Sequence, residues 1–246
     1  MINLSEKIIG RNAVLEALKS RRSINKLVLA KGLAGGSIGP IIAKAREAGI
    51  PVQEVERAHL DTLAESTKHQ GVMALAAARE YVDVADILAA ARERGEDPVV
   101  LLLDEIEDPH NLGAILRTAE GAGVHGVIIP KRRSVALTET VAKASAGAVE
   151  YVPVARVSNI AQTIDALKKE GLWIVGTDPL GPKTYWEQDL RGPLGIVVGS
   201  EGKGMGRLVK EKCDYLVNIP MRGNIASLNA SVATSLIIYE IVRQRG

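Results

Sequence analysis

Short unbroken apolar runs alternate along the chain with segments whose apolar residues recur at helical spacing. The first eighty residues contain three strand-like runs, which are Lys26–Ala30, Val52–Val55 and Val72–Ala78. One helical pattern opens at Asn12, a candidate N-cap, and a second has Ile41 and Ala45 on one side. This order predicts a small α/β sandwich for residues 1–80.

Residues 81–98 change in composition to Asp, Glu, Ala and Arg, with Val84, Ile87 and Leu88 along one side of a helix. We interpret this stretch as an interdomain linker that carries one helix. Such a linker leaves residues 99–246 as a separate domain.

Strand-like and helical segments alternate again from residue 99 to residue 246. The predicted strands are Val99–Asp104, Gly126–Pro130, Val152–Val154, Leu172–Thr177, Leu194–Val198 and Leu216–Ile219. Helices are predicted at about Asn111–Ala122, Thr138–Ser145, Ser158–Lys169, Arg207–Lys212 and from about Ser227 onward. This βαβ alternation predicts a mostly parallel sheet that helices cover on both faces.

The last helix is apolar on more than one side. Leu228, Val232, Leu236, Tyr239 and Val242 follow one another at spacings of four and three, and three isoleucines between 237 and 241 form a second apolar face. Two interpretations stay open: a helix buried between layers, or a helix that also forms a subunit interface.

The composition is that of a folded protein with few aromatic residues. Hydrophobic residues make up 46% of the 246 residues, aromatic residues only 3%, and phenylalanine is absent. Any RNA recognition would therefore depend on backbone and shape more than on base stacking. The apolar runs are too short to span a membrane and the first residues lack a signal-peptide pattern, so we expect a cytoplasmic protein without membrane association.

The formal net charge of +2 is too small to identify a nucleic-acid partner by itself. Positive charge is concentrated in the N-terminal third, where Lys19, Arg21 and Arg22 lie within one turn. Such short clusters are more often solvated surface than phosphate-binding sites. The single cysteine, Cys213, cannot form an internal disulfide, and we expect an inert, buried thiol and no metal site.

Three polar, glycine-containing turns follow buried-type strands. They are Asp108–Thr118, Gly199–Gly206 and Ile219–Ser231. Open α/β sheets bind ligands at the carboxyl ends of their strands, so these turns predict one composite site. The middle turn is not a Walker motif, because glycine rather than serine or threonine follows Lys203, and no dinucleotide fingerprint is present. Its acidic Glu201 also argues against a KH-type phosphate loop.

In order and spacing, the three turns resemble the signature motifs of the SPOUT class of RNA methyltransferases, in particular its SpoU branch, which methylates ribose 2′-hydroxyls. Residues 1–80, with His69-Gln70-Gly71, are similar to the ribosomal-protein-L30e-like RNA-binding domain that precedes the catalytic domain in many members. The resemblance implies an α/β methyltransferase domain over residues 99–246, whose C-terminal segment is threaded through an earlier loop as a trefoil knot.

The resemblance also implies S-adenosylmethionine (AdoMet) as the methyl donor, no metal, and a homodimer that assembles its site across two subunits. The positions that match the family's cofactor site are Thr177, Gly199, Ile219, Met221 and Leu228. Those that match its catalytic site are Arg117, Asn111, Glu201, Ser227 and Asn229. Because the pKa of arginine is above about 12, Arg117 would orient the hydroxyl and stabilise a developing alkoxide rather than act as a base.

For the N-terminal domain, the residues expected to bind RNA are Arg11, Asn12, Arg21, Arg22, His69 and Gln70. His69 could equally be a hydrogen-bonded structural residue. Taken singly, the catalytic candidates also have structural explanations: Asn111 and Ser227 could cap helices, and Arg117 could pair with a nearby glutamate.

Within the family, the resemblance is closest to enzymes that methylate a guanosine ribose in large-subunit (23S) ribosomal RNA. Ribosomal RNA is therefore the expected substrate. A transfer-RNA ribose methyltransferase of the same branch is the alternative, because a fold does not determine a substrate. A non-catalytic RNA-binding ribosome assembly factor is a third interpretation, although no key position departs from the motifs.

Overall fold

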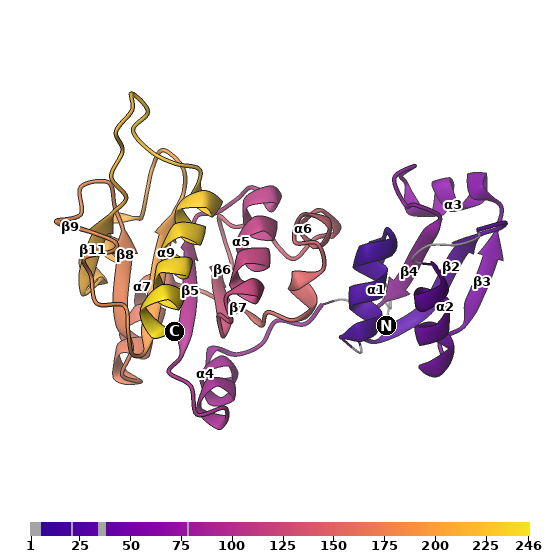
Figure 1. The fold of residues 1–246 in the computed structure, drawn as a ribbon, viewed down its shortest axis with the longest axis horizontal. Helices are drawn as coiled ribbons and strands as arrows, with labels where there is room; N and C mark the ends of the chain where they lie inside the picture. The colour runs from indigo at the N-terminus through magenta and orange to yellow at the C-terminus, as the bar shows by residue number, and fades with distance from the viewer. Residues whose placement is uncertain (1–5, 21, 34–37, 78) are drawn as a thin grey trace. The chain divides into compact units, whose positions relative to one another are not determined.

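The computed structural model describes residues 6–20, 22–33, 38–77 and 79–246. Contacts divide the chain into two compact units, both drawn in Figure 1. The first unit combines residues 1–80 with residues 137–151, and the second combines residues 81–136 with residues 152–246. This division differs from the expected domains in two places, residues 81–98 and residues 137–151.

The first unit is a four-stranded mixed sheet with helices on both faces. Its strands are β1 (Glu6–Ile9), β2 (Ile24–Ala30), β3 (Val52–Val55) and β4 (Val72–Ala76), in the order β1-β4-β2-β3. The helices are α1 (Arg11–Lys19) and α2 (Ile38–Glu47) on one face and α3 (Arg57–Ala64) on the other. The expected α/β sandwich is confirmed.

Burial on both faces explains why β2 is apolar without alternation. Leu27 and Leu29 pack with α1 and α2, whereas Val28 and Ala30 pack with α3. Apolar periodicity does not reveal β1 or α3, because β1 opens with two polar residues and α3 buries only two side chains. The expected cap is also displaced by two residues: α1 has its N-cap at Gly10, and Asn12 is exposed within the first turn.

A buried ion-pair cluster holds residues 137–151, which include α6 (Glu139–Ala144), in the first unit. Arg22 and Arg79 both donate to Glu6 and Glu150, and the four side chains are between 5% and 17% exposed. Two positive and two negative groups compensate one another, which lets charged side chains be buried. Local patterns could not predict this cluster, because Arg22 and Glu150 are 128 residues apart.

The second unit is a parallel sheet of seven strands in the part of the chain that the structure describes. The strand order is β7-β6-β5-β10-β8-β11-β9. The strands are β5 (Val99–Asp104), β6 (Gly126–Pro130), β7 (Val154–Val157), β8 (Trp173–Thr177), β9 (Lys183–Thr184), β10 (Leu194–Gly199) and β11 (Tyr215–Asn218). Every pairing is parallel, so the expected sheet is confirmed.

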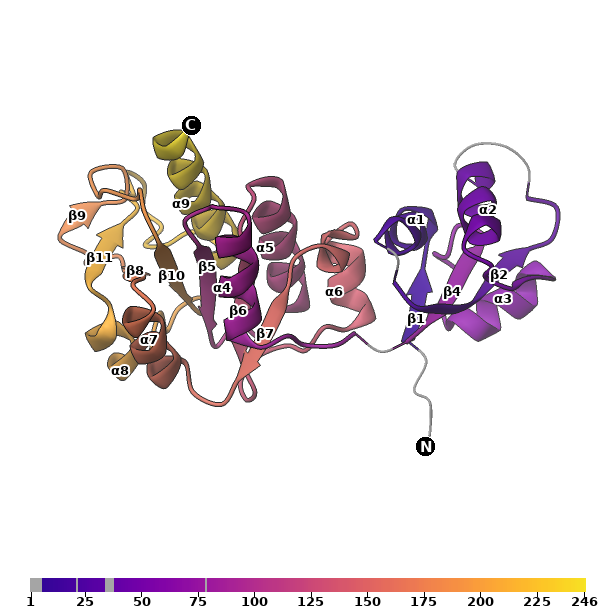
Figure 2. The same ribbon diagram turned by 90° about the horizontal axis from the view of Figure 1, so that it is seen from below.

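Helices cover both faces of this sheet. Figure 2 shows α5 (Pro109–Gly121) and α9 (Ala230–Arg245) on the face opposite α7 (Ile160–Lys169) and α8 (Arg207–Lys212). Helix α4 (Val84–Glu93) lies on the same face as α7 and α8, since its Ile87 shares a core with Ile164 of α7 and Val209 of α8. Residues 81–98 therefore supply core side chains to the second unit and are more than a linker.

The two apolar faces of α9 differ in burial. Ile237, Ile238 and Ile241 are buried, and this is the face that packs into the layers. The stripe of Val232, Leu236, Tyr239 and Val242, by contrast, is between 37% and 53% exposed. The stripe that contains Leu236 and Tyr239 is thus free to meet another molecule. In the described part of the chain, no helix is long and apolar enough to cross a membrane.

The segment between β11 and α9 lies against the turn that follows β10. Glu201 of that turn accepts hydrogen bonds from Asn229 and from the Ala230 N–H. Threading of the C-terminal segment through an earlier loop would require such a contact. The trefoil knot itself stays a prediction.

Candidate active site

The three predicted turns meet at one edge of the parallel sheet. Strands β5, β10 and β8 are neighbours, and the register pairs Asp104 at the end of β5 with Gly199 at the end of β10. Thr177 ends β8, and β11 runs parallel to β8 on its other side. Because these strands are parallel, the turns after them emerge at the same edge.

Hydrogen bonds join one side chain from each turn. Asn111 Nδ2 donates to Glu201 Oε1 over 3.0 Å. Asn229 Nδ2 donates to the same carboxylate oxygen over 2.6 Å and to Asn111 Oδ1 over 2.8 Å. One carboxylate therefore holds the starts of α5 and α9 beside the turn after β10, and three of the five catalytic candidates form one cluster.

The helices α5 and α9 are capped by side chains other than Asn111 and Ser227. Asp108 caps α5 and Asn229 caps α9, each by accepting hydrogen bonds from N–H groups of the first turn. The explanation that Asn111 and Ser227 serve only as helix caps therefore does not apply to either residue. Ser227 is exposed and lies one turn of chain before the helix begins.

A cavity of about 440 Å³ lies beside this cluster, and we call it the cofactor cavity. Its lining includes every residue expected to contact the cofactor, namely Thr177, Gly199, Ile219, Met221 and Leu228. Glu201 and Ser227 line it as well. The volume is in the range of roughly 300–1,000 Å³ that is usual for pockets enclosing small molecules.

Glycine is required at position 199 by the fold of the turn itself. A Cβ there would collide with backbone atoms of Gly204 and Met205. The turn is closed by paired backbone hydrogen bonds between Ser200 and Gly204, which bring the chain back over Gly199. The missing side chain therefore makes room for the protein's own backbone at the wall of the cavity.

Sequence reasoning missed Asp104 and Asp178, which also belong to the site. Asp104 is 8% exposed, and its Oδ2 accepts from the Gly206 N–H over 2.8 Å, so it fastens the turn after β10 to the end of β5. Burial raises the pKa of its carboxyl. Asp178 lines the cavity and pairs with Lys210 over 2.7 Å. Both aspartates stand where a buried strand ends, a position that could have identified them.

The structure does not bring Arg117 together with the other catalytic candidates. Arg117 is exposed on α5, does not line the cofactor cavity, and forms no ion pair or hydrogen bond within the described residues. The structural explanation, an ion pair with a nearby glutamate, is therefore not what the fold shows. An arginine at this point is available to a group outside its own chain.

Two of the side chains expected to bind RNA are engaged within the first unit, which argues against a contact with RNA. Arg22 belongs to the ion-pair cluster. His69 is 0% exposed; its Nε2 lies 2.6 Å from Asp61 Oδ1, and its Nδ1 accepts from the Gly71 N–H. Burial and these two bonds favour the structural interpretation of His69, because both ring nitrogens are already bonded within the protein.

The remaining RNA candidates include a small exposed group at the start of α1. Asn12 and Gln70 are exposed, and Arg11 Nε donates to the Gln70 carbonyl oxygen over 3.1 Å. Arg21 lies outside the described residues. Contact of Arg11, Asn12 and Gln70 with RNA stays a prediction.

The single cysteine has no part in the site. Burial raises the pKa of the Cys213 thiol to about 12, so the thiol stays protonated and unreactive at neutral pH. Among the described residues, no three His, Cys, Asp or Glu side chains are placed to hold a metal ion.

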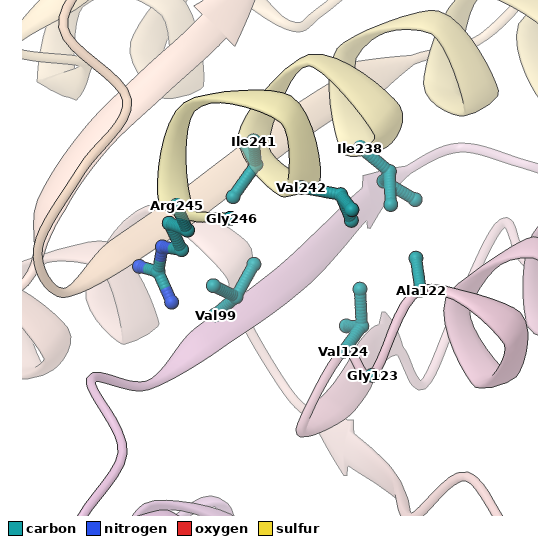
Figure 3. Close-up of a pocket in the computed structure, with 9 residues that line it drawn as sticks. All are labelled: Val99, Ala122, Gly123, Val124, Ile238, Ile241, Val242, Arg245 and Gly246. Carbon is teal, nitrogen blue, oxygen red and sulfur yellow. The ribbon is translucent and has the colours of Figure 1, made fainter.

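Figure 3 shows a different cavity, of about 280 Å³, beside the C-terminal end of α9. Val99, the first residue of β5, lines it, so it lies at the opposite edge of the sheet from the three turns. Its one charged side chain, Arg245, donates to the carbonyl oxygens of Asp97 and Gly192. The remaining side chains of its lining are aliphatic, so this cavity is not the candidate active site.

Family models match both parts of the chain. The model described as SpoU rRNA Methylase family matches residues 98–239, and the model described as RNA 2′-O ribose methyltransferase substrate binding matches residues 7–82. YacO of Bacillus subtilis (strain 168), assigned by name to the TrmH family of tRNA/rRNA methyltransferases, is 52% identical over 238 residues. The match covers 97% of this chain and 95% of YacO.

Two solved structures are similar over nearly the whole chain. The AdoMet-bound rRNA methyltransferase of Sinorhizobium meliloti is 27% identical with a TM-score of 0.81, covering 97% of this chain and 87% of its own. The SpoU methyltransferase AviRb of Streptomyces viridochromogenes, in complex with AdoMet, is 25% identical with a TM-score of 0.83, covering 98% and 90%. The chain belongs to the SpoU rRNA methylase family, and it carries the substrate-binding domain of RNA ribose 2′-O-methyltransferases ahead of its methylase domain.

Proposed function

We propose that this chain transfers a methyl group from AdoMet to the ribose 2′-hydroxyl of a guanosine in large-subunit ribosomal RNA. The observation that carries the proposal is the bonded cluster of Asn111, Glu201 and Asn229 beside a cavity that all five expected cofactor residues line. The AdoMet held by two related structures supports the choice of cofactor.

The lining of the cofactor cavity fits AdoMet in its chemistry. Leu180, Ile219 and Leu228 provide apolar surface for an adenine ring, and the turns at Thr177 and Gly199 provide backbone hydrogen-bonding groups. Glu201 adds a negative charge, which favours a cationic sulfonium. These are the residues that would hold the cofactor.

When bound, AdoMet supplies an electrophilic methyl group on its sulfonium. The protein must hold the ribose hydroxyl in line with that group and accommodate the loss of its proton. Asn111 and Asn229 fix Glu201, and so keep the wall of the site rigid. Arg117 orients the hydroxyl and stabilises its developing negative charge, because a guanidinium stays protonated at neutral pH and cannot serve as the base. A phosphate of the RNA is the proposed proton acceptor.

We further propose a homodimer in which each subunit supplies Arg117 to the site of the other. Arg117 is exposed and unpaired within the described part of its own chain, away from the lining of its own cavity. It lies on α5, which packs beside α9, and α9 carries the exposed stripe that contains Leu236 and Tyr239. Burying this stripe against a second copy would remove apolar surface from water.

Ribosomal RNA is the proposed substrate because the S. meliloti structure that matches along the whole chain is named as an rRNA methyltransferase. Transfer RNA is the second candidate, since the name of YacO includes both RNAs. The cytoplasm, where both RNAs are found, is the proposed location.

The experiment that tests this function measures methyl transfer from radiolabelled AdoMet to undermodified large-subunit ribosomal RNA and, separately, to bulk transfer RNA. A 2′-O-methyl group blocks alkaline cleavage, so resistant positions map the product. Label at one guanosine of ribosomal RNA is expected. Label only in transfer RNA would move the chain to the second candidate, and label in neither RNA nor in ribosomal particles would refute the activity.

Mixing two inactive variants tests the shared site. Arg117→Ala should bind AdoMet but not transfer methyl, and Glu201→Ala should disrupt the cofactor cavity. If the arginine acts across the interface, a mixed dimer regains one intact site, and an exchanged equimolar mixture should reach about a quarter of the wild-type rate. No recovery after subunit exchange would contradict the shared site, because a site within one chain cannot be restored by mixing.

A further inference from the structure

A second, smaller cavity adjoins the cofactor cavity. Its volume is about 240 Å³, and it shares Ser200, Glu201 and Lys203 with the larger one, so the two meet at the turn after β10. Its other wall is the loop between β5 and α5, together with Asn111 in the first turn of α5. A group that enters the smaller cavity therefore lies beside the proposed methyl donor and beside the Asn111 cluster.

Three carboxylates of that loop line the smaller cavity, and they differ in what they already bind. Glu105 accepts from Arg133 over 2.7 Å, and Asp108 is the cap of α5. Glu107 is exposed and forms no hydrogen bond or ion pair within the described residues. The Glu107 carboxylate is therefore the one that is available to a ligand.

A buried hydroxyl between the two cavities also lacks a partner. Ser200 Oγ is buried and forms no hydrogen bond within the described residues. Ser200 lines both cavities. A buried polar group without a partner costs free energy, which a ligand with a matching group recovers. The observation thus points to a polar ligand at the junction of the cavities.

We infer that the smaller cavity receives the target nucleobase and that Glu107 recognises it as guanine, an inference that rests on the proposed function. A carboxylate only accepts hydrogen bonds, so it selects neighbouring donors and repels a phosphate. Guanine presents two neighbouring donors, N1–H and the N2 amino group, next to the O6 acceptor on its Watson–Crick edge. Lys203, which lines the same cavity and carries no ion pair within the described residues, is a donor suited to O6.

The other three bases fit this lining less well. Adenine and cytosine have one amino group beside a ring nitrogen that accepts hydrogen bonds, and uracil has one N–H between two carbonyl oxygens. Each of them would set an acceptor against the carboxylate of Glu107. A site built for hydrogen bonds rejects a ligand that leaves its polar groups unpaired.

The test compares guanosine with inosine, which lacks the N2 amino group, at the methylated position of a synthetic RNA. That position is first mapped with the wild-type protein, and kcat/KM is then measured on both RNAs for the wild type and for Glu107→Gln. The wild type should prefer guanosine by about tenfold or more, as expected for a bidentate contact. In Glu107→Gln the ratio of guanosine to inosine should fall close to one, while the affinity for AdoMet in calorimetry stays unchanged.

Glu93→Gln is the matched control, because Glu93 is an exposed carboxylate on α4 that lines neither cavity. It should keep the wild-type ratio. A Glu107→Gln protein that also keeps it would overturn the inference, and so would a wild type that methylates the ribose of a nucleotide other than guanosine; in both cases methyl transfer itself is intact. A wild type that methylates no RNA would overturn the proposed function, and this inference with it.

Discussion

Substitution of Glu150 tests whether the segment 137–151 belongs to the first unit in solution. Glu150 is 5% exposed, and its Oε1 accepts from Arg22 over 3.0 Å and from Arg79 over 2.5 Å. Glu150→Gln removes one of the two negative charges in the cluster and leaves two buried guanidinium groups against Glu6 alone. Breaking a buried ion pair by removing one partner costs about 3–5 kcal/mol.

A loss of that size is large for a unit made of residues 1–80 and 137–151. In domains of roughly 60–100 residues, 1 kcal/mol lowers the unfolding midpoint by about 4–8 °C, so Glu150→Gln should lower the midpoint of this unit by more than about 12 °C. Both tryptophans, Trp173 and Trp186, are in the second unit, so their fluorescence would not report the change.

Hydrogen exchange followed by mass spectrometry can assign the loss to one unit. In Glu150→Gln, exchange should accelerate in β1, α1 and residues 137–151 and stay unchanged in β5 and β10. Glu139→Gln is the matched control, because Glu139 forms a surface pair with Lys143 in the same segment, and such pairs contribute at most about 1 kcal/mol. Equal exchange in the two variants would refute the reasoning, since the buried cluster could not then stabilise the unit.

Three other substitutions or reactions test single features of the site and the core. Gly199→Ala should abolish AdoMet binding in calorimetry, because its Cβ collides with backbone at the cavity wall, whereas Gly39→Ala, where the space is open, should not. Cys213, whose thiol pKa burial raises to about 12, should react with a disulfide reagent at pH 8 only after unfolding; fast reaction of the folded protein would contradict its burial. Burial raises the pKa of Asp104 above 3.8, so its protonated form stabilises the fold, and that contribution is lost as the pH rises through the raised value. Asparagine does not titrate, so only the wild type should lose this contribution as the pH rises. In urea titrations between pH 3.5 and 7, the free energy of unfolding of Asp104→Asn should therefore rise relative to that of the wild type. A difference that does not change with pH would contradict the burial of this carboxyl.

The sequence by itself determined most of the strands and helices and the place of the ligand site, but not β1, α3 or β9. The strands Val52–Val55, Val99–Asp104 and Gly126–Pro130 and the helix Arg207–Lys212 have the predicted bounds. These elements are governed by local periodicity, and burial of a parallel strand on both faces makes its apolar run continuous. Since open parallel sheets bind ligands at the carboxyl ends of their strands, the strand pattern also predicts that the polar turns meet at one edge of the sheet.

Only the tertiary structure decided which polar side chains meet. Asn111, Glu201 and Asn229 become partners because the strands before them, β5, β10 and β11, are parallel in one sheet and end at the same edge. Arg117, from the same motif as Asn111, is left exposed. His69 lies in a turn whose residues suggest contact with RNA, but the fold buries its side chain. A residue type sets how many hydrogen bonds a side chain can form, but burial and distance between remote segments decide with which group it forms them. For the same reason, Glu150 could be assigned to the first unit only from the folded chain.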